Sequence, residues 1–217
     1  VPPAVVHRAL RPEQMRGRSN RPSQETEHEA ETRRLERQRA CQERVAERHA
    51  KTLGVDPELI EPYLVSLRRI SEGVSLVQEI SPRIHARVMA HGEFISTTIG
   101  AAFLNQQGIS TRWLDARTLL RSLDGPLEDP ARGYLSANCD FEPNEELQRT
   151  HADMPESVLL TQGFVARNQH GHTGLLGRGG SDTSAAYLAA LFSAERCEIW
   201  TDVPGIYTAN PRELPHA

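Results

Sequence analysis

The feature that most limits the possible folds is a strand–helix–strand pattern near the end of the 217-residue chain. Residues 157–161 (SVLLT) and 197–201 (CEIWT) are apolar runs of strand length. Between them, residues 182–193 are rich in alanine and favour a helix. Two strands that are connected by a helix form a βαβ unit with a parallel sheet. The pattern therefore predicts an α/β fold.

Two amphipathic helices are expected before this unit. The first begins at Asp56-Pro57, which supply an N-cap and a proline at the first helical position, and continues for about 20 residues. The second begins in the same way at Ser81-Pro82 and ends at Gly108. Residues 111–115 have a short, extended character, whereas the polar stretch 123–155 gives no assignable pattern.

The first 50 residues differ from the rest in charge. They contain 11 arginines and 8 glutamates, whereas the whole chain has a net charge of −4. Residues 1–24 are expected to form loop or disorder, and residues 25–51 favour a helix with a thin apolar face. We interpret this helix as solvated, with an arginine-rich nucleic-acid arm as the alternative. The expected division is an Arg/Glu-rich segment (1–50) and a second region (51–217).

The composition excludes several classes of function. No apolar run approaches the roughly 18 residues that a membrane span needs. The 3 cysteines lie far apart, which favours a reducing compartment, and His170 and His172 have no further ligand at zinc spacing, so no metal site is expected. The slightly acidic balance gives no general attraction to nucleic acid. Lys51 is the only lysine among the 25 basic residues, so a mechanism that needs a lysine ammonium has one candidate.

The most informative motif is the glycine-rich stretch LGRGGSDTS (176–184). A glycine turn that leads into a helix presents free amide groups and partial positive charge, which suits a phosphate or carboxylate, and Arg178 could clamp the same anion. The spacing matches neither a Walker loop nor the dinucleotide fingerprint. A purely structural turn explains the glycines equally well. Asp182 favours a function, because a carboxylate placed where it would repel bound phosphate often has a catalytic role.

Two other stretches carry weaker signals. Residues 199–212 place polar groups beyond the end of a strand, where open α/β sheets bind ligands, with Tyr207 as a stacking face and Arg212 as a phosphate partner. The alternative is an ordinary Pro-Gly turn. In HGEFIST (91–97), Gly92 interrupts a helix, which suggests close approach of another group, and Glu93 could receive an ammonium. A surface glutamate beside a packing glycine is the alternative.

Four motifs together resemble aspartokinase, of the amino acid kinase family. They are HGEFIST (91–97), TQGF (161–164), LGRGGSDTSA (176–185) and WTDVPGIYTANPR (200–212), and the similarity covers roughly residues 57–212. The phrases SPRIHARVMAHGE and TRWLDAR look most like the bacterial form that is fused to diaminopimelate decarboxylase. The resemblance implies a three-layer α/β/α sandwich with a mainly parallel sheet.

The resemblance also implies an activity and its binding partners. Aspartokinases transfer the γ-phosphoryl group of Mg-ATP to the side-chain carboxylate of L-aspartate, which is the first step towards lysine, threonine and methionine. By motif position, Glu93 would bind the amino group of the substrate and Arg178 its α-carboxylate. Gly179, Gly180 and Ser181 would line the aspartate and phosphoryl site.

The catalytic and nucleotide-binding roles follow in the same way. Asp182 would organise the catalytic groups, and Thr201, Asp202, Tyr207 and Arg212 would hold the nucleotide. Magnesium would accompany the ATP. The family implies a cytoplasmic enzyme that forms a homo-oligomer in the full-length protein, without nucleic-acid or membrane partners.

The chain departs from the family pattern at both ends. No match to the lysine-containing KFGGTS loop precedes residue 57, Lys51 lies in a helical context, and the chain stops before a segment matching FGAKVLHP. No match to an ACT domain follows, and the chain starts at Val1 and not at a methionine. The expected fold is therefore an amino acid kinase domain that is incomplete at both ends. The alternative is a catalytically inactive fragment that only binds a ligand or partner, whereas a different amino acid kinase is disfavoured by HGEFIST together with GRGGSD.

Overall fold

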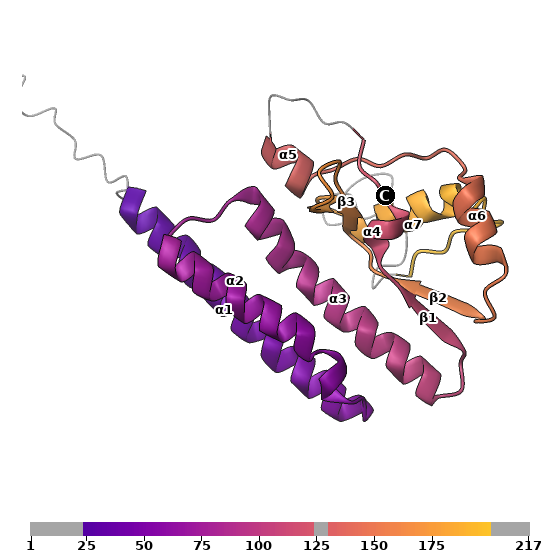
Figure 1. The fold of residues 1–217 in the computed structure, drawn as a ribbon, viewed down its shortest axis with the longest axis horizontal. Coiled ribbons are helices and arrows are strands. Elements are labelled where there is room, and N and C mark those ends of the chain that lie inside the picture. The colour runs from indigo at the N-terminus through magenta and orange to yellow at the C-terminus, as the bar shows by residue number, and fades with distance from the viewer. Residues whose placement is uncertain (1–23, 124–129, 201–217) are drawn as a thin grey trace, which may run out of the picture.

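A computed structural model describes residues 24–123 and 130–200. Three long helices, α1 (Gln24–Leu53), α2 (Glu61–Val77) and α3 (Pro82–Gln106), pack against one another on one side of the molecule (Figure 1). The predicted starts of the second and third are confirmed. Asp56 caps the short 3-10 helix η2 (Pro57–Leu59) that leads into α2, and the Ser81 hydroxyl accepts a hydrogen bond from the Ile84 amide at 3.3 Å.

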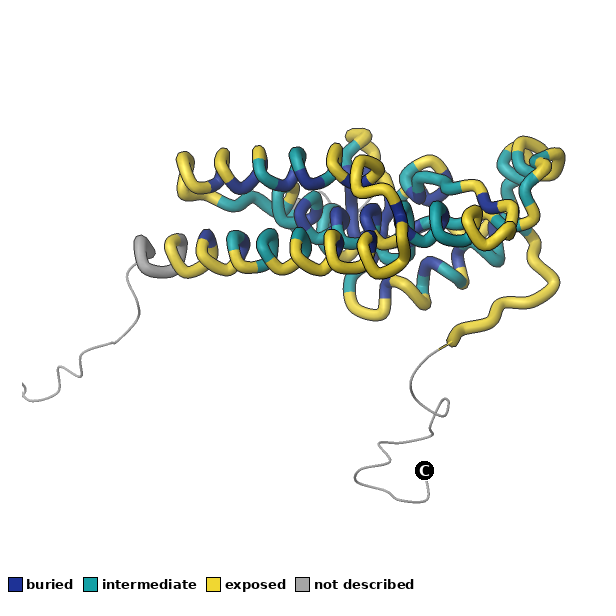
Figure 2. The backbone as a smooth tube through the Cα atoms, turned by 90° about the horizontal axis from the view of Figure 1, so that it is seen from below, coloured by how far each residue is buried: buried dark blue, intermediate teal, exposed yellow. Residues whose placement is uncertain are grey.

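The helix expected at residues 25–51 is present within α1, but it is not solvated on all sides. Leu35, Ala46 and Ala50 are 5%, 3% and 1% exposed and belong to the cluster of apolar side chains between α1, α2 and α3. Figure 2 shows this stripe of buried positions along helices whose outer faces are exposed. The alanines account for the difference, because small side chains let a helix lie close to its neighbours with little apolar area of its own.

The strands lie beside α3. β1 (Thr111–Leu114) and β2 (Val158–Thr161) pair in parallel, from Thr111 opposite Val158 to Leu114 opposite Thr161. β3 (Val165–Arg167) and β4 (Thr173–Leu175) form an antiparallel hairpin. The extended segment 111–115 and the strand 157–161 are thus confirmed, and the unassigned stretch 123–155 contains α5 (Pro130–Leu135) and α6 (Glu145–Ala152).

Helices cover both faces of the strands. Val165 and Leu175 pack with Phe94 of α3, whereas Ala166, the next residue of β3, and Leu176, which directly follows β4, pack with the helix α7 (Gly180–Leu191) on the other face. This alternation is the two-residue period of a strand that is buried on both sides. The fold is therefore of the α/β class, with helices, strands and helices in successive layers.

One predicted strand is wrong over the residues that can be checked. Residues 197–200 form no strand, and Ile199 and Trp200 are 50% and 89% exposed, while Thr201 lies outside the described residues. The parallel pair is β1–β2, which is connected through α4 (Ala116–Leu119), α5 and α6, and not a pair on either side of α7. A short apolar run becomes a strand only where an edge pairs with it and side chains cover it, and among the described residues nothing pairs with residues 197–200.

No helix in the described ranges is long and apolar enough to cross a membrane.

Candidate functional site

The glycine-rich loop joins β4 to α7 and is shaped by close packing. Gly177 and Gly179 have φ angles of +77° and +70°, a region that side chains other than glycine rarely adopt. A Cβ on Gly180 would lie 2.5 Å from Cδ2 of Phe164, closer than packed atoms allow. The glycines therefore meet both a conformational and a packing requirement, and they bring the loop against the TQGF segment that follows β2.

The start of α7 has amide groups without acceptors. Gly179 is the N-cap and provides no side-chain cap, and Ser181 and Asp182 lie inside the first turn. The Gly180 amide donates to the Gly177 carbonyl at 3.1 Å, and the Thr183 amide donates to the Gly179 carbonyl at 3.0 Å. The amides of Ser181 and Asp182 have no acceptor among the described residues, as expected for the first turn of a helix. These two donors, with the positive end of the helix dipole, suit an anion.

The charged side chains at this helix start face solvent. Arg178, Ser181 and Asp182 are exposed, and within the described ranges their side chains make no hydrogen bond or ion pair. Arg178 can therefore reach an anion at the helix start without breaking an existing ion pair. Asp182 places a carboxylate one turn or less from the same two free amides.

The TQGF segment packs the glycine-rich loop against the end of β2. A Cβ on Gly163 would lie 2.9 Å from Oγ of Ser181, which explains why this position has no side chain. The Phe164 amide donates to Oγ of Ser184 at 2.7 Å, and this hydroxyl donates to the Gly180 carbonyl at 2.7 Å. Phe164 itself has a φ of +68°. The start of α7 is therefore held on β2 by backbone contacts and by one buried hydroxyl.

Glu93 lies on α3 at the other side of the candidate site. Its side chain is half-buried and has no hydrogen-bond or ion-pair partner in the part of the chain that the structure describes. Partial burial raises the pKa of its carboxyl above the ordinary value, because the charged form loses hydration. An ammonium group at this position would restore the lost stabilisation of the carboxylate.

The neighbours of Glu93 serve packing. Gly92 faces α1, where its Cβ would lie 3.3 Å from Nε2 of Gln42, so the close approach suggested by this glycine is made by another helix. His91 is buried, its Nδ1 lies 2.6 Å from the Arg87 carbonyl, and burial lowers its pKa. These contacts favour the alternative in which Gly92 allows close packing of α3 against α1.

The predicted site residues fall into separate groups. The structure brings Gly179, Gly180 and Ser181 against the TQGF segment, with Arg178 and Asp182 beside them. Within the described ranges Glu93 makes no hydrogen bond or ion pair with this group, and it is connected to the TQGF segment through Thr97 and Gln162. The predicted nucleotide-binding residues lie outside the described residues: Thr201, Asp202, Tyr207 and Arg212.

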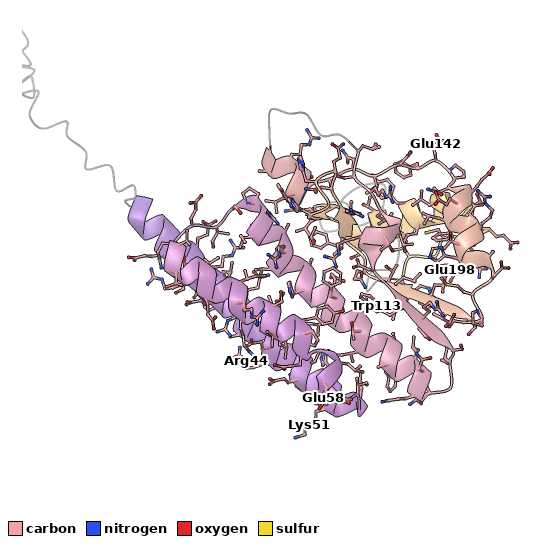
Figure 3. All side chains as sticks on the ribbon, viewed as in Figure 1. Arg44, Lys51, Glu58, Trp113, Glu142 and Glu198 are labelled. Carbon is pink, nitrogen blue, oxygen red and sulfur yellow. The ribbon has the colours of Figure 1, made fainter. Side chains whose placement is uncertain are left out.

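Sequence reasoning assigned no role to four side chains that organise this region. Gln162 is 0% exposed and bonds to Thr97 and to the backbone after β1, and Thr97 also accepts from the indole of Trp113. Figure 3 shows Trp113 between α3 and the strands. Arg117 forms a two-pronged ion pair with Asp115, at 2.6 Å for Nη2–Oδ2, and its guanidinium lies 4.6 Å from the Phe94 ring centroid. A polar glutamine at the end of an apolar strand was the available signal, because a buried amide must find partners.

The described residues give no support for a metal held by protein side chains alone. No group of three His, Cys, Asp or Glu side chains comes together in them. His172 is instead 2.9 Å from the Tyr134 hydroxyl through its Nδ1. Lys51, the single lysine, is exposed at the end of α1 and points away from the strands (Figure 3).

Comparisons with known proteins agree on one family. The model of the amino acid kinase family matches residues 5–217. Bifunctional aspartokinase/homoserine dehydrogenase 2 of Escherichia coli is 37% identical over 73% of this chain and 18% of its own length. Lysine-sensitive aspartokinase 3 of the same organism is 35% identical over 74% of this chain and 34% of its own length. The chain thus spans about a third or less of these two relatives.

Solved structures give the same result. E. coli aspartokinase III in complex with aspartate and ADP superposes with a TM-score of 0.59 at 33% identity, over 73% of this chain and 34% of that one. The same enzyme with lysine and aspartate gives 0.60 at 32% identity, over 83% and 39%. Because the family model matches almost the whole chain, and because these relatives share its fold, the chain belongs to the amino acid kinase family and is similar to its aspartokinases.

Proposed function

We propose that this chain is part of the catalytic domain of an aspartate kinase, which phosphorylates the side-chain carboxylate of L-aspartate with ATP to give 4-phospho-L-aspartate. In this role it would serve the first step of lysine, threonine and methionine biosynthesis in the cytoplasm. The observation that carries the proposal is the start of α7, where the free amides of Ser181 and Asp182 lie beside the exposed Arg178. The relatives that are named aspartokinases, one of them solved with aspartate and ADP, supply the substrate class.

Each end of aspartate has a complementary group in this arrangement. Arg178 would bind the α-carboxylate with its planar guanidinium, which matches the geometry of a carboxylate. Glu93 would bind the α-ammonium, since its half-buried carboxylate has no cation in the described structure. The accepting carboxylate and the transferred phosphoryl group would then lie at the start of α7. There, the amides of Ser181 and Asp182 are the free donors, because the Gly180 amide is already bonded within the loop.

Little covalent help is required from the protein for this reaction. Phosphoryl transfer depends on aligning two anions and on neutralising the charge of the transferred group. The amides at the helix start supply a fixed positive environment for the phosphoryl group, while Arg178 neutralises the α-carboxylate. We assign to Asp182 the role of organising the groups around the transferred phosphoryl.

The magnesium that accompanies ATP fits the donor set at this helix start. Mg²⁺ takes oxygen ligands, commonly one or two carboxylates together with the phosphates of the nucleotide. The carboxylate of Asp182 is exposed and has no partner in the described ranges, so it is available as such a ligand. When bound, the ion would neutralise charge on the phosphates. Thr201, Asp202, Tyr207 and Arg212 are proposed to hold the nucleotide, on the motif alone.

The proposal is tested by measuring aspartate-dependent release of ADP from Mg-ATP. The assay should be run with this chain and with a version extended at both ends, because the chain covers only part of the length of its relatives. We expect turnover with L-aspartate, and none with D-aspartate, in at least the extended version. Turnover in the extended version alone would identify the chain as an incomplete enzyme. A lack of turnover in both would contradict the proposal and favour a ligand-binding or partner-binding fragment.

The assembly of the protein is tested separately. We expect the extended version to be a homo-oligomer that binds neither nucleic acid nor membranes. Light scattering coupled to size-exclusion chromatography gives its mass directly. A monomer at micromolar concentration would contradict this part of the proposal.

A further inference from the structure

Gln162 is a fully buried amide whose hydrogen bonds tie three segments together. It is 0% exposed and is the first residue after β2, within the TQGF segment. Its Nε2 donates to Oγ1 of Thr97 at 2.9 Å and to the Leu114 carbonyl at 3.3 Å, and its Oε1 accepts from the Ala116 amide at 2.8 Å. A buried amide with its donors and acceptor in use fixes its neighbours more narrowly than an apolar side chain does.

The hydroxyl of Thr97 carries this connection to Glu93. Thr97 follows Glu93 by one turn of α3, and its Oγ1 donates to the Glu93 carbonyl at 2.7 Å. The same oxygen accepts from Nε1 of Trp113 at 3.0 Å and from Gln162. The hydrogen of this hydroxyl is shared with the Phe94 carbonyl at 3.3 Å, so its one donor and two acceptor positions are all in use. The turn of α3 that bears Glu93 is therefore fixed to the ends of β1 and β2.

The residues that follow Gln162 carry the connection to α7. Gly163 presses against Ser181 so closely that a Cβ would lie 2.9 Å from its Oγ, and the Phe164 amide bonds to Ser184. No hydrogen bond joins α3 directly to α7 within the described residues. The hydrogen bonds of Thr97 and Gln162, continued by the packing of Gly163 and the hydrogen bond of Phe164, therefore connect the two halves of the proposed aspartate site.

We propose that Gln162 is a positioning residue, which acts through Thr97 to set the place of Glu93 relative to the free amides at the start of α7. This inference rests on the proposed function, because only a ligand that touches both halves makes their relative position matter. Aspartate is such a ligand, since its ammonium and its side-chain carboxylate must reach Glu93 and α7 together. Binding of the nucleotide depends less on the distance between Glu93 and the start of α7.

The test uses substitutions that keep shape while they remove hydrogen bonds. Thr97→Val and Gln162→Leu should each raise the KM for aspartate at least tenfold and change the KM for ATP less than twofold, measured in the extended version. Thr97→Ser keeps the hydroxyl, so its KM for aspartate should stay within threefold of that of the unmodified protein. Ser96→Ala is the matched control, because Ser96 donates to the same Glu93 carbonyl at 3.1 Å but does not contact Gln162. Equal rises in both KM values, or no rise in either, would overturn the proposal.

A second readout does not require activity. In the ¹⁵N-labelled chain, Gln162→Leu and Thr97→Val should shift the amide resonances of Glu93 and of Ser181 and Asp182 together. The indole of Trp113 donates to Thr97 and will shift with it, so retained dispersion of the amide resonances of α1, which has no hydrogen bond to Thr97 or Gln162 in the described residues, shows whether the chain remains folded. If only residues that touch Gln162 shift, the link is contradicted even when turnover is present. If turnover is absent in the unmodified protein but the distant shifts occur, the aspartate kinase proposal fails while the structural link stands.

Discussion

The layer formed by α1, α2 and α3 and the loop at the start of α7 differ in how they use their polar and apolar groups. In the helical layer, apolar side chains such as Ile60, Leu64 and Leu67 are at most 2% exposed, and the starts of η2 and α3 are capped by the side chains of Asp56 and Ser81. At the start of α7 the cap is a glycine, two amides have no acceptor among the described residues, and the nearby Arg178 and Asp182 are exposed.

This difference separates what stabilises the fold from what is available to a ligand. Burial of apolar surface is the main favourable contribution to folding, and the apolar cluster between α1, α2 and α3 supplies this contribution. Free donors and unpaired charges contribute nothing to the folded state on their own, but they can interact with an anion without first giving up another partner. Substitutions in the two regions should therefore change different measurements.

The largest effect is expected in the helical layer. Leu64→Ala removes a side chain that is 2% exposed, and it should lower the free energy of unfolding by about 2–5 kcal/mol. Leu76→Ala, in the same helix but 86% exposed, is the matched control and should change it by less than about 0.5 kcal/mol. Urea denaturation measures both. Similar losses in the two variants would show that this layer is not a packed core.

The next effect tests the boundary between the two regions. Gly180→Ala places a methyl group 2.5 Å from Phe164, so it should lower the free energy of unfolding by about 1–3 kcal/mol and also remove aspartate-dependent turnover. Gly73→Ala, in α2, meets nothing within 4 Å and should instead stabilise by about 0.5–1 kcal/mol. Denaturation and ADP release are measured on both. A Gly180→Ala variant that is active and stable would disprove the packing requirement at the loop.

A smaller effect, confined to function, is expected at Asp182. Asp182→Ala should lower turnover at least tenfold, which is about 1.4 kcal/mol of transition-state stabilisation, and leave the free energy of unfolding within about 0.5 kcal/mol. Asp153→Ala removes an exposed carboxylate at the end of α6 and serves as the control for loss of charge. An unchanged rate in Asp182→Ala would show that the proposed role is wrong.

The helical layer was also the region that the sequence predicted best. Periodic apolar residues, together with Asp56-Pro57 and Ser81-Pro82, are local signals, so they placed η2, α2 and α3 without any knowledge of the rest. The apolar pattern of α1 has few large side chains and predicted its burial less well. The small buried stripe of α1 depends on alanines, which fit equally well on an exposed face.

The strands and the site were predicted only in part because they depend on distant partners. Residues 158–161 pair with β1, whose partner residues lie 47 positions earlier in the sequence, whereas residues 197–200 find no partner in the described structure. The glycine loop was identified from local spacing. Gln162 was not, because its role depends on Thr97 and Ala116, which are 65 and 46 residues away in sequence.

The smallest expected effect is a pH dependence of ligand binding at Glu93. Burial raises the pKa of this carboxyl, so the ionised form that would bind the ammonium of aspartate is lost at a higher pH than for an ordinary glutamate. As the pH falls through this raised pKa, aspartate affinity should decrease by up to about tenfold for each further pH unit. As the pH rises above it, affinity should level off.

Glu93→Gln should bind weakly and show no such step, while Glu58→Gln, on the exposed η2, should behave like the unmodified protein. Calorimetric titration with L-aspartate between pH 5 and 8 measures the step directly, and the same step in Glu93→Gln would assign it to a different group.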